Sequence, residues 1–166
     1  GDEEEIKPVA VYTGVDPASS LSIRADFFVI ATLGIDNEGS IYIIDIFRTK
    51  LDPSLQPEEI IKIYKKFNPK RMKIETVAYQ EALRASVRKL MFEEGLYIPG
   101  LEKGVKPRTK KSERLLSLVA PMARGEFYFR PQDIDAQAEF LSYPRGKHDD
   151  VMDAVWTALD RSRPSR

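Results

Sequence analysis

Two long apolar segments separated by a short polar loop constrain the fold of this chain more than any other feature of its sequence. Residues 27–35 are almost continuously apolar, residues 36–40 are polar and contain a glycine, and residues 41–48 are again rich in isoleucine. Apolar runs of this length around such a loop are typical of a β-hairpin in a sheet. A shorter β-rich run over residues 9–15 precedes them. The sequence therefore predicts three antiparallel strands at the start of the fold.

After residue 51 the pattern changes to helical periodicity that alternates with short β-rich runs. Apolar residues at helical spacing predict helices over residues 57–67, 78–94, 112–124, 133–140 and 148–160. Strands are predicted over residues 72–75, 96–99 and 127–129, and a mobile loop over residues 100–111. Three antiparallel strands followed by such units predict an α/β fold, with a mixed central sheet flanked by helices.

The length and composition of the chain narrow the possible classes of protein. With 166 residues it has the length of one domain, which we expect to span residues 9–160, between a disordered segment at 1–8 and a tail at 161–166. It has no run of about 18 apolar residues and no signal peptide at its acidic start. The absence of Cys excludes disulfides, thiolate zinc sites and Cys nucleophiles, and a single His excludes sites that need two. Lys and Arg number 26, as do Asp and Glu, so overall charge does not favour nucleic acid.

Acidic residues lie at the ends of three predicted elements. Asp16 ends the first strand, Glu75 ends the strand over 72–75, and Asp149, Asp150 and Asp153 open the last helix. On that helix Asp153 shares a face with Asp149 or Asp150. Hard divalent cations prefer carboxylate oxygens, and two-metal phosphodiester hydrolysis needs several carboxylates from separate elements. The acids are therefore candidate metal ligands.

Each of these acids also has a structural explanation when it is taken alone. Asp16 precedes a proline and is a possible turn residue, Glu75 is a possible solvated acid, and Asp149 and Asp150 are possible caps of the last helix. Their order along the chain is more informative than any one of them. A strand-end Asp, a strand-end Glu and an acidic start of the final helix follow the layout of the ribonuclease H-like fold.

Three motifs resemble the nuclease domain of the large terminase subunit of tailed bacteriophages. They are Gly-Val-Asp-Pro-Ala at 14–18, Ile-Glu at 74–75, and Lys-His-Asp-Asp-Val-Met-Asp-Ala at 147–154. The resemblance covers residues 9 to 159, and its last motif is the most specific. It implies a ribonuclease H-like fold and a metal-dependent endonuclease that cleaves concatemeric double-stranded viral DNA during packaging.

Carried over by position, the resemblance implies roles for the same acids. Asp16, Glu75 and Asp150 are the implied catalytic residues and metal ligands, and Asp149 and Asp153 are neighbouring metal ligands. The implied cofactor is Mg²⁺ or Mn²⁺, with two ions in the active complex. His148, which precedes the cluster, is interpreted as a helix-entry residue rather than a ligand.

The resemblance also implies a setting for the activity. The family's full-length protein acts at the procapsid portal in the cytoplasm of the infected bacterium, with an N-terminal ATPase domain, a small terminase subunit and the portal as partners. This chain has no G-x-x-x-x-G-K-[ST] motif, so it cannot be the motor, and we expect cleavage without ATP. Because it begins with Gly1, we expect it to be a C-terminal part of such a protein, monomeric in isolation and not bound to a membrane.

A basic segment follows in the predicted loop. Residues 102–114 have a local excess of four positive charges, because Glu102 and Glu113 face six basic residues, Lys103, Lys106, Arg108, Lys110, Lys111 and Arg114. We expect these residues, together with Lys147, to contact DNA phosphates, with salt-dependent binding and little sequence selectivity.

Two alternatives to this terminase-like nuclease remain open at this point. One is another ribonuclease H-like nuclease, such as a Holliday-junction resolvase or ribonuclease H. The other is a non-catalytic module that binds DNA or a portal. A metal-dependent HD-type phosphohydrolase, which the His-Asp pair at 148–149 suggests, is excluded because it needs more than one His.

Overall fold

The computed structural model describes residues 10–17, 27–75, 79, 81–102, 104–106 and 108–160. The predictions for residues 1–8 and 161–166, and that for Lys103, lie outside these residues.

The described residues form a mixed sheet with strand order β4-β1-β2-β3-β5. The strands are β1 (Ala10–Asp16), β2 (Phe28–Ile35), β3 (Ile41–Thr49), β4 (Arg71–Ile74) and β5 (Phe127–Tyr128). β1, β2 and β3 are antiparallel, as the three apolar runs predict, whereas β4 pairs in parallel with β1 and β5 in parallel with β3. The parallel pairs require crossover connections, which the helices supply.

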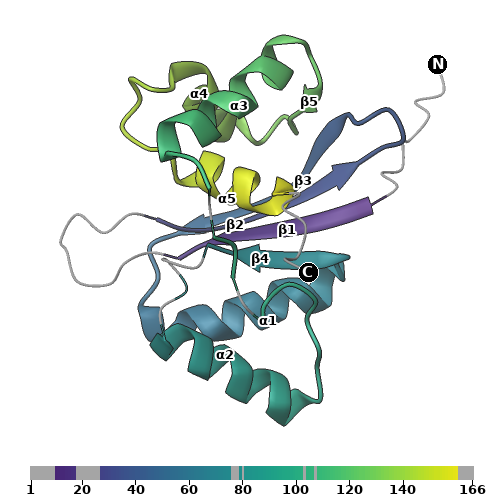
Figure 1. The fold of residues 1–166 in the computed structure, drawn as a ribbon, viewed down its shortest axis with the longest axis vertical. Coiled ribbons are helices and arrows are strands. Elements are labelled where there is room, and N and C mark those ends of the chain that lie inside the picture. Colours follow the sequence, from purple (N-terminus) through teal and green to yellow (C-terminus); the bar gives the residue numbers. More distant parts are fainter. Residues whose placement is uncertain are drawn as a thin grey trace.

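Helices cover both faces of the sheet (Figure 1). They are α1 (Gln56–Phe67), α2 (Glu81–Glu94), α3 (Lys111–Ala123), α4 (Ile134–Ser142) and α5 (Asp150–Leu159), with a 3-10 turn, η1 (Pro53–Leu55), before α1. α1 and α2 lie on one face, and α5 lies on the other beneath α3 and α4. None of these helices, in the part of the chain that the structure describes, has the length and apolarity needed to cross a membrane.

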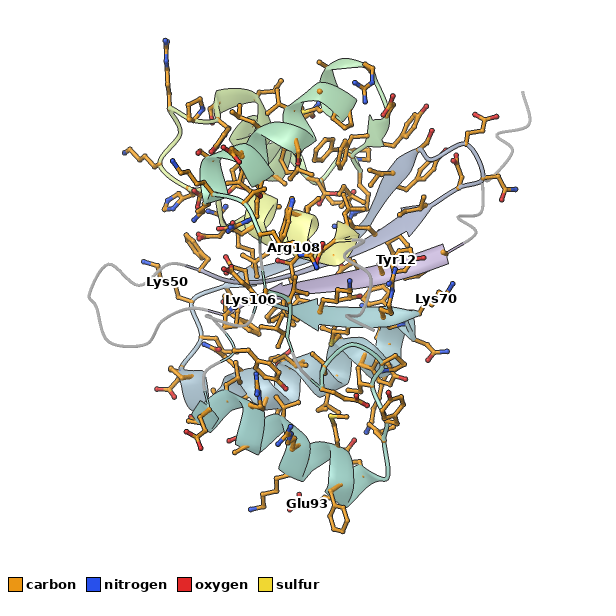
Figure 2. All side chains as sticks on the ribbon, in the orientation of Figure 1. Tyr12, Lys50, Lys70, Glu93, Lys106 and Arg108 are labelled. Atoms are coloured by element: carbon orange, nitrogen blue, oxygen red, sulfur yellow. The ribbon has the colours of Figure 1, made fainter. Side chains whose placement is uncertain are left out.

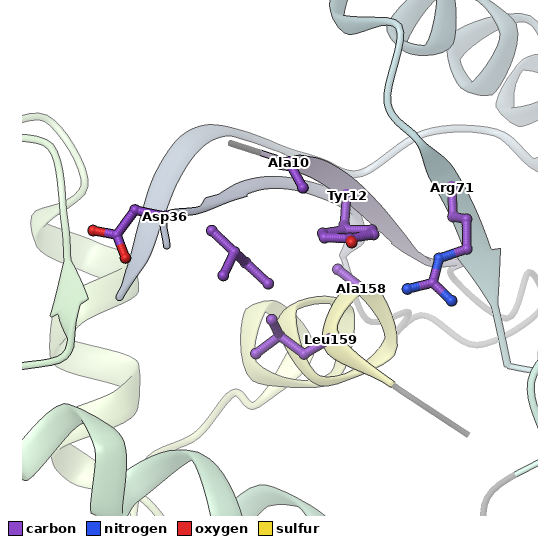
Figure 3. Close-up of a pocket in the computed structure, with 7 residues that line it drawn as sticks. Ala10, Tyr12, Asp36, Arg71, Ala158 and Leu159 are labelled. Atoms are coloured by element: carbon purple, nitrogen blue, oxygen red, sulfur yellow. The ribbon is translucent and has the colours of Figure 1, made fainter. Parts of the chain in front are cut away.

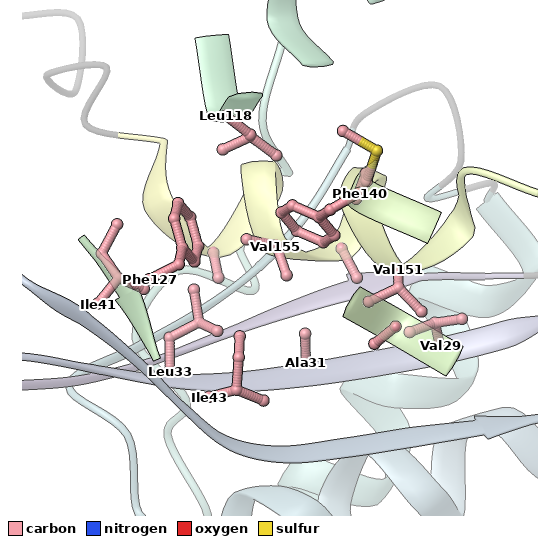
Figure 4. Packing of buried hydrophobic residues seen from close by; sticks show 14 of the residues in the cluster. Val29, Ala31, Leu33, Ile41, Ile43, Leu118, Phe127, Phe140, Val151 and Val155 are labelled. Carbon is pink, nitrogen blue, oxygen red and sulfur yellow. The ribbon is translucent and has the colours of Figure 1, made fainter. Parts of the chain in front are cut away.

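β2 is buried on both faces, which explains its continuous apolar run. Val29, Ala31 and Leu33 face α5, where the apolar ridge of that helix meets them (Figure 4). Phe28 and Ile30 face α1 and α2 in the second core. The fold is thus three layers, with two hydrophobic cores separated by the sheet.

The predicted strand over residues 96–99 is wrong. These residues form a loop beside β4. One hydrogen bond of 2.9 Å joins the loop to the strand, donated by the Met72 N–H to the carbonyl of Pro99. Pro99 has no N–H to continue a ladder. Gly100 then takes a φ of +97°, where a side chain would overlap the Met72 carbonyl. The loop therefore shields this edge of the sheet without extending it.

Gly14 determines how closely α5 approaches β1. A Cβ atom at this position would overlap the carbonyl oxygen of Ala154 and lie 2.5 Å from the backbone nitrogen of Ala158. The helix backbone thus rests directly on the strand backbone. This contact is made two residues before Asp16, so it brings the start of α5 to the carboxyl end of β1.

We predict that Gly14→Ala lowers the free energy of unfolding by about 2 to 3 kcal/mol, because overpacking against backbone atoms cannot be relieved by a rotamer change. Chemical denaturation monitored by circular dichroism measures this loss. Adding Ala158→Gly should not restore stability, because residue 14 would still meet the backbone. A Gly14→Ala protein as stable as the wild type would show that α5 moves away freely.

Candidate active site

The carboxylates meet at one edge of the sheet because of strand register. β1 and β4 are parallel neighbours, and Val15 is paired with Ile74. Asp16 and Glu75 are the next residues on the two strands, so both lie at the carboxyl edge. α5, which begins at Asp150, starts at this same edge. The three groups of acids that were predicted from separate elements are thereby brought together.

Burial and mutual repulsion raise the pKa of two carboxyl groups in this cluster of acids. Burial raises the pKa of Asp16 to about 9, and the charges of Asp153, Asp150 and Glu75 contribute to the rise, whereas Lys111 opposes it. Burial also raises the pKa of Asp153 to about 6, against the lowering effect of its bond to Lys111. Desolvation and neighbouring negative charges disfavour the ionised carboxylate, so both pKa values lie above the ordinary value of an Asp.

Two cations from α3 face these acids. The Lys111 Nζ lies 2.8 Å from Asp153 Oδ2 and 3.2 Å from Asp149 Oδ1. Arg114 is only 9% exposed, with a guanidinium nitrogen 3.9 Å from Glu75 Oε1. Both residues were predicted to contact DNA phosphates, and their position against the acids was not foreseen.

Arg114 is held in place by further contacts. It donates a hydrogen bond of 2.9 Å to the carbonyl of Thr109 and lies over the Trp156 ring at 5.0 Å from its centroid. The side chain therefore connects α3 and α5 next to Glu75. Its burial removes it from the exposed surface on which a phosphate contact was expected.

The donor set suits a hard divalent cation in chemistry and charge. All the candidate ligands are carboxylates, and their shared repulsion is what a doubly charged ion relieves. Within the described residues, however, no three acidic or His side chains are already arranged around one ion position. Instead, the ammonium of Lys111 occupies oxygens of Asp149 and Asp153. Metal binding would require these carboxylates to turn from the lysine.

Glu139 fixes the start of α5 and was missed by the sequence analysis. Its side chain is buried, and its two oxygens accept hydrogen bonds from the backbone N–H groups of Val151 at 3.4 Å and Met152 at 3.1 Å. Burial raises the pKa of Glu139 to about 7, although these bonds and Arg48 lower it. An acid in the buried stripe of α4, next to Phe140, is the sequence feature that could have revealed it.

The other predicted residues lie around this edge. Lys106, Arg108, Lys110 and Lys147 are exposed, and Figure 2 shows Lys106 and Arg108 between Lys50 on one side and Tyr12 on the other. His148 is also exposed and meets the Phe27 ring edge to face at 5.5 Å. This position agrees with a helix-entry residue.

A cavity of about 350 Å³ lies at the opposite end of β1 (Figure 3). Tyr12, Asp36 and Arg71 supply its polar groups, and the Arg71 guanidinium lies over the Tyr12 ring at 4.9 Å. The cavity adjoins the C-terminal end of α5, whereas the carboxylates surround the N-terminal end. It is therefore separate from the candidate active site.

Comparison with solved structures identifies the class of fold. The nuclease domain of the P22 large terminase is 16% identical, with a TM-score of 0.64 over 89% of this chain and 78% of that one. The large terminase of a thermophilic bacteriophage, solved in complex with ATP-gamma-S, is 14% identical, with a TM-score of 0.62 over 91% of this chain and 39% of that one. The yeast mitochondrial Holliday junction resolvase is 14% identical, with a TM-score of 0.53 over 94% of this chain and 80% of that one. The fold is ribonuclease H-like, as predicted.

The sequence family is more specific than the fold. The model of the terminase RNaseH-like domain family matches residues 13–161, and the chain belongs to this family. No curated protein matched the chain. The resemblance drawn from the motifs at 14–18, 74–75 and 147–154 is thus confirmed.

The raised pKa of Asp16 predicts a pH dependence of stability without metal. The pKa is 3.8 when unperturbed and about 9 in the folded chain, so between these values the folded state binds a proton that the unfolded state has released. Stability therefore falls as pH rises, by about 1.4 kcal/mol per pH unit between about pH 7 and pH 8.5.

Denaturation in a metal chelator at several pH values measures this slope. Asp16→Asn should flatten it, whereas Asp135→Asn, which changes an exposed acid on α4, should keep the wild-type slope. A wild-type stability that rises over this pH range would contradict the prediction.

Proposed function

We propose that this chain is a divalent-metal-dependent endonuclease that cleaves double-stranded DNA. The observation that carries the proposal is the convergence of Asp16, Glu75 and the acids of α5 at one sheet edge, in a member of the terminase RNaseH-like domain family. Carboxylates from separate rigid elements are what metal-assisted phosphodiester hydrolysis requires.

In this proposal Asp16, Glu75 and Asp150 are the catalytic carboxylates, and Asp149 and Asp153 complete the ligand set. Bound Mg²⁺ or Mn²⁺ ions, two in the active complex, would supply an activated water and stabilise the leaving oxygen. Asp16 is fixed by β1 and Asp150 by the first turn of α5. This rigidity holds carboxylate oxygens in place before substrate arrives, which lowers the reorganisation needed for reaction.

The basic residues that precede α3, which we call the basic loop, give the proposed site a surface for the DNA backbone. Val105 forms a bridge with Glu75, and its N–H donates a hydrogen bond of 2.6 Å to the Ile74 carbonyl. Lys106 and Arg108 follow directly and are exposed. We assign Lys110 and Lys147 to DNA phosphates as well. Contacts with phosphates position the duplex without reading its bases.

Family membership supports the biological setting. We propose cleavage of concatemeric viral DNA during genome packaging, at the procapsid portal in the cytoplasm of the infected bacterium. An N-terminal ATPase domain, a small terminase subunit and the portal would be the partners, while the isolated domain is monomeric and cleaves without ATP. The chain lacks a G-x-x-x-x-G-K-[ST] motif, which supports this separation of cleavage from translocation.

One alternative has an observation in its favour. The structural similarity to a Holliday junction resolvase is compatible with another ribonuclease H-like nuclease, selective for branched DNA or RNA–DNA hybrids. Substrate preference separates these functions.

We predict that Asp16→Asn and Asp150→Asn each slow DNA cleavage about 10³-fold, because a lost metal ligand removes several kcal/mol of transition-state stabilisation. Cleavage of linear duplex, four-way junction and RNA–DNA hybrid in Mg²⁺ or Mn²⁺ measures the effect. Asp135→Asn on α4 is the matched control and should cleave at the wild-type rate.

Undiminished cleavage by both site variants would refute the catalytic assignment. Preferential cleavage of junctions or hybrids would favour the alternative nuclease. Absence of both cleavage and metal binding in the wild type would favour a non-catalytic module.

We also predict that Lys106→Ala and Arg108→Ala each weaken duplex binding equally for unrelated sequences. Each change should reduce the slope of log affinity against log salt by about 1, because one phosphate contact is lost. Fluorescence anisotropy in a chelator, which prevents cleavage, measures both quantities. Lys62→Ala, at an exposed position of α1 on the other face of the sheet, should leave the slope unchanged, and the same slope for all variants would exclude this surface.

A further inference from the structure

Lys111 occupies a position that its own helix does not explain. It is the first residue of α3, where the partial positive charge of the helix N-terminus disfavours a cation. Its ammonium is instead held by Asp153 at 2.8 Å and Asp149 at 3.2 Å, 42 and 38 residues further along the chain respectively. The position of the Lys111 ammonium is thus explained by its contacts with Asp149 and Asp153 rather than by the helix that it begins.

The ammonium and a metal ion would use the same oxygens. Asp149 and Asp153 each direct a carboxylate oxygen at Lys111, and carboxylate oxygens are the ligands that a hard divalent cation takes. A lysine ammonium carries one charge and a divalent ion carries two. Metal entry at these carboxylates therefore requires Lys111 to leave them.

The Lys111 side chain has room to move from the carboxylates toward the neighbouring exposed basic residues. Its side chain is 51% exposed, and its four-carbon stem is flexible. It directly follows the exposed basic residues Lys106, Arg108 and Lys110, which the proposed function assigns to DNA phosphates. A released ammonium at this position would therefore lie next in sequence to the residues that the proposed function assigns to the DNA backbone.

We propose that Lys111 is the resident counter-cation of the site. It offsets part of the negative charge of Asp149 and Asp153 in the metal-free protein and transfers to a DNA phosphate when metal ions take these carboxylates. The inference rests on the proposed function, since it assumes that the acids bind metal. Metal binding and DNA binding then favour each other. A bound metal ion takes the carboxylates from Lys111 and frees its ammonium for a phosphate, and a bound phosphate takes Lys111 from the carboxylates and frees them for metal.

The chain offers a matched control for the loss of a surface ion pair. Lys65 on α1 pairs with Glu94 on α2, and the two side chains are 52% and 37% exposed. The pair of Lys111 and Asp149 has nearly the same exposure, 51% and 36%. Lys65→Gln therefore removes an ion pair that matches the pair of Lys111 with Asp149 in exposure, at a position away from the candidate active site.

Calorimetric titration of Mn²⁺ without DNA tests the proposal. Lys111→Gln should bind Mn²⁺ about fivefold more tightly than the wild type, because the competing ion pairs are gone. Lys111→Arg, which keeps the charge, and Lys65→Gln should bind with near wild-type affinity. Circular dichroism verifies that each variant is folded.

A second readout measures the transfer to phosphate. Ca²⁺ should increase the affinity of the wild type for a short DNA duplex, with gels verifying that the duplex stays intact, and the increase should be smaller in Lys111→Gln. Unchanged or weaker Mn²⁺ affinity in folded Lys111→Gln would overturn the counter-cation role while leaving the nuclease proposal intact. Failure of both the wild type and the variant to bind Mn²⁺ would overturn the metal dependence and this inference together.

Discussion

The direct contact between the backbones of α5 and β1 is the constraint on which the site depends. Only a glycine at residue 14 leaves room for the helix, because any Cβ atom would meet Ala154 and Ala158. With the helix seated there, its acidic first turns lie beside the end of β1. The parallel pairing of β1 with β4 then places Glu75 next to Asp16. A glycine thus positions carboxylates that it does not itself contact.

Buried charges hold α5 at both ends. Glu139 accepts hydrogen bonds from the first turn, and the ammonium of the buried Lys73 donates to the carbonyl of Asp160 just after the helix. Each charge has the sign that the helix dipole favours at its end. Loss of the Glu139 side chain would deprive the buried N–H groups of Val151 and Met152 of this acceptor, which costs more than the loss of an exposed hydrogen bond. The helix is therefore fixed along its length as well as against the strand.

Local patterns in the sequence were sufficient for the main elements and for the acids at their ends. The apolar run of β2 and the ridge of Val151 and Val155 reflect burial that any such fold requires. The failures have two causes, one local and one that involves contacts between distant residues. The strand at 96–99 was wrong because Pro99 and Gly100 interrupt its pairing, and the inward positions of Lys111 and Arg114 depend on α5, which follows them in the chain. Charge composition alone cannot distinguish a lysine that faces solvent from one that faces a carboxylate.

The same contacts explain how a chain with zero net charge can approach DNA with an acidic site. Phosphates are repelled by ionised carboxylates around Asp16, whose pKa is raised first by burial and then by the charges of Asp153, Asp150 and Glu75. Lys111 and Arg114 offset part of it from the side of α3, and the exposed Lys106 and Arg108 lie just beyond. Because attraction between exposed charges falls off within about 10 Å in salt, the order of these groups matters more than their sum. In the proposed function a duplex would bind these exposed basic residues, and it would come close to the carboxylates only when further positive charge has entered among them.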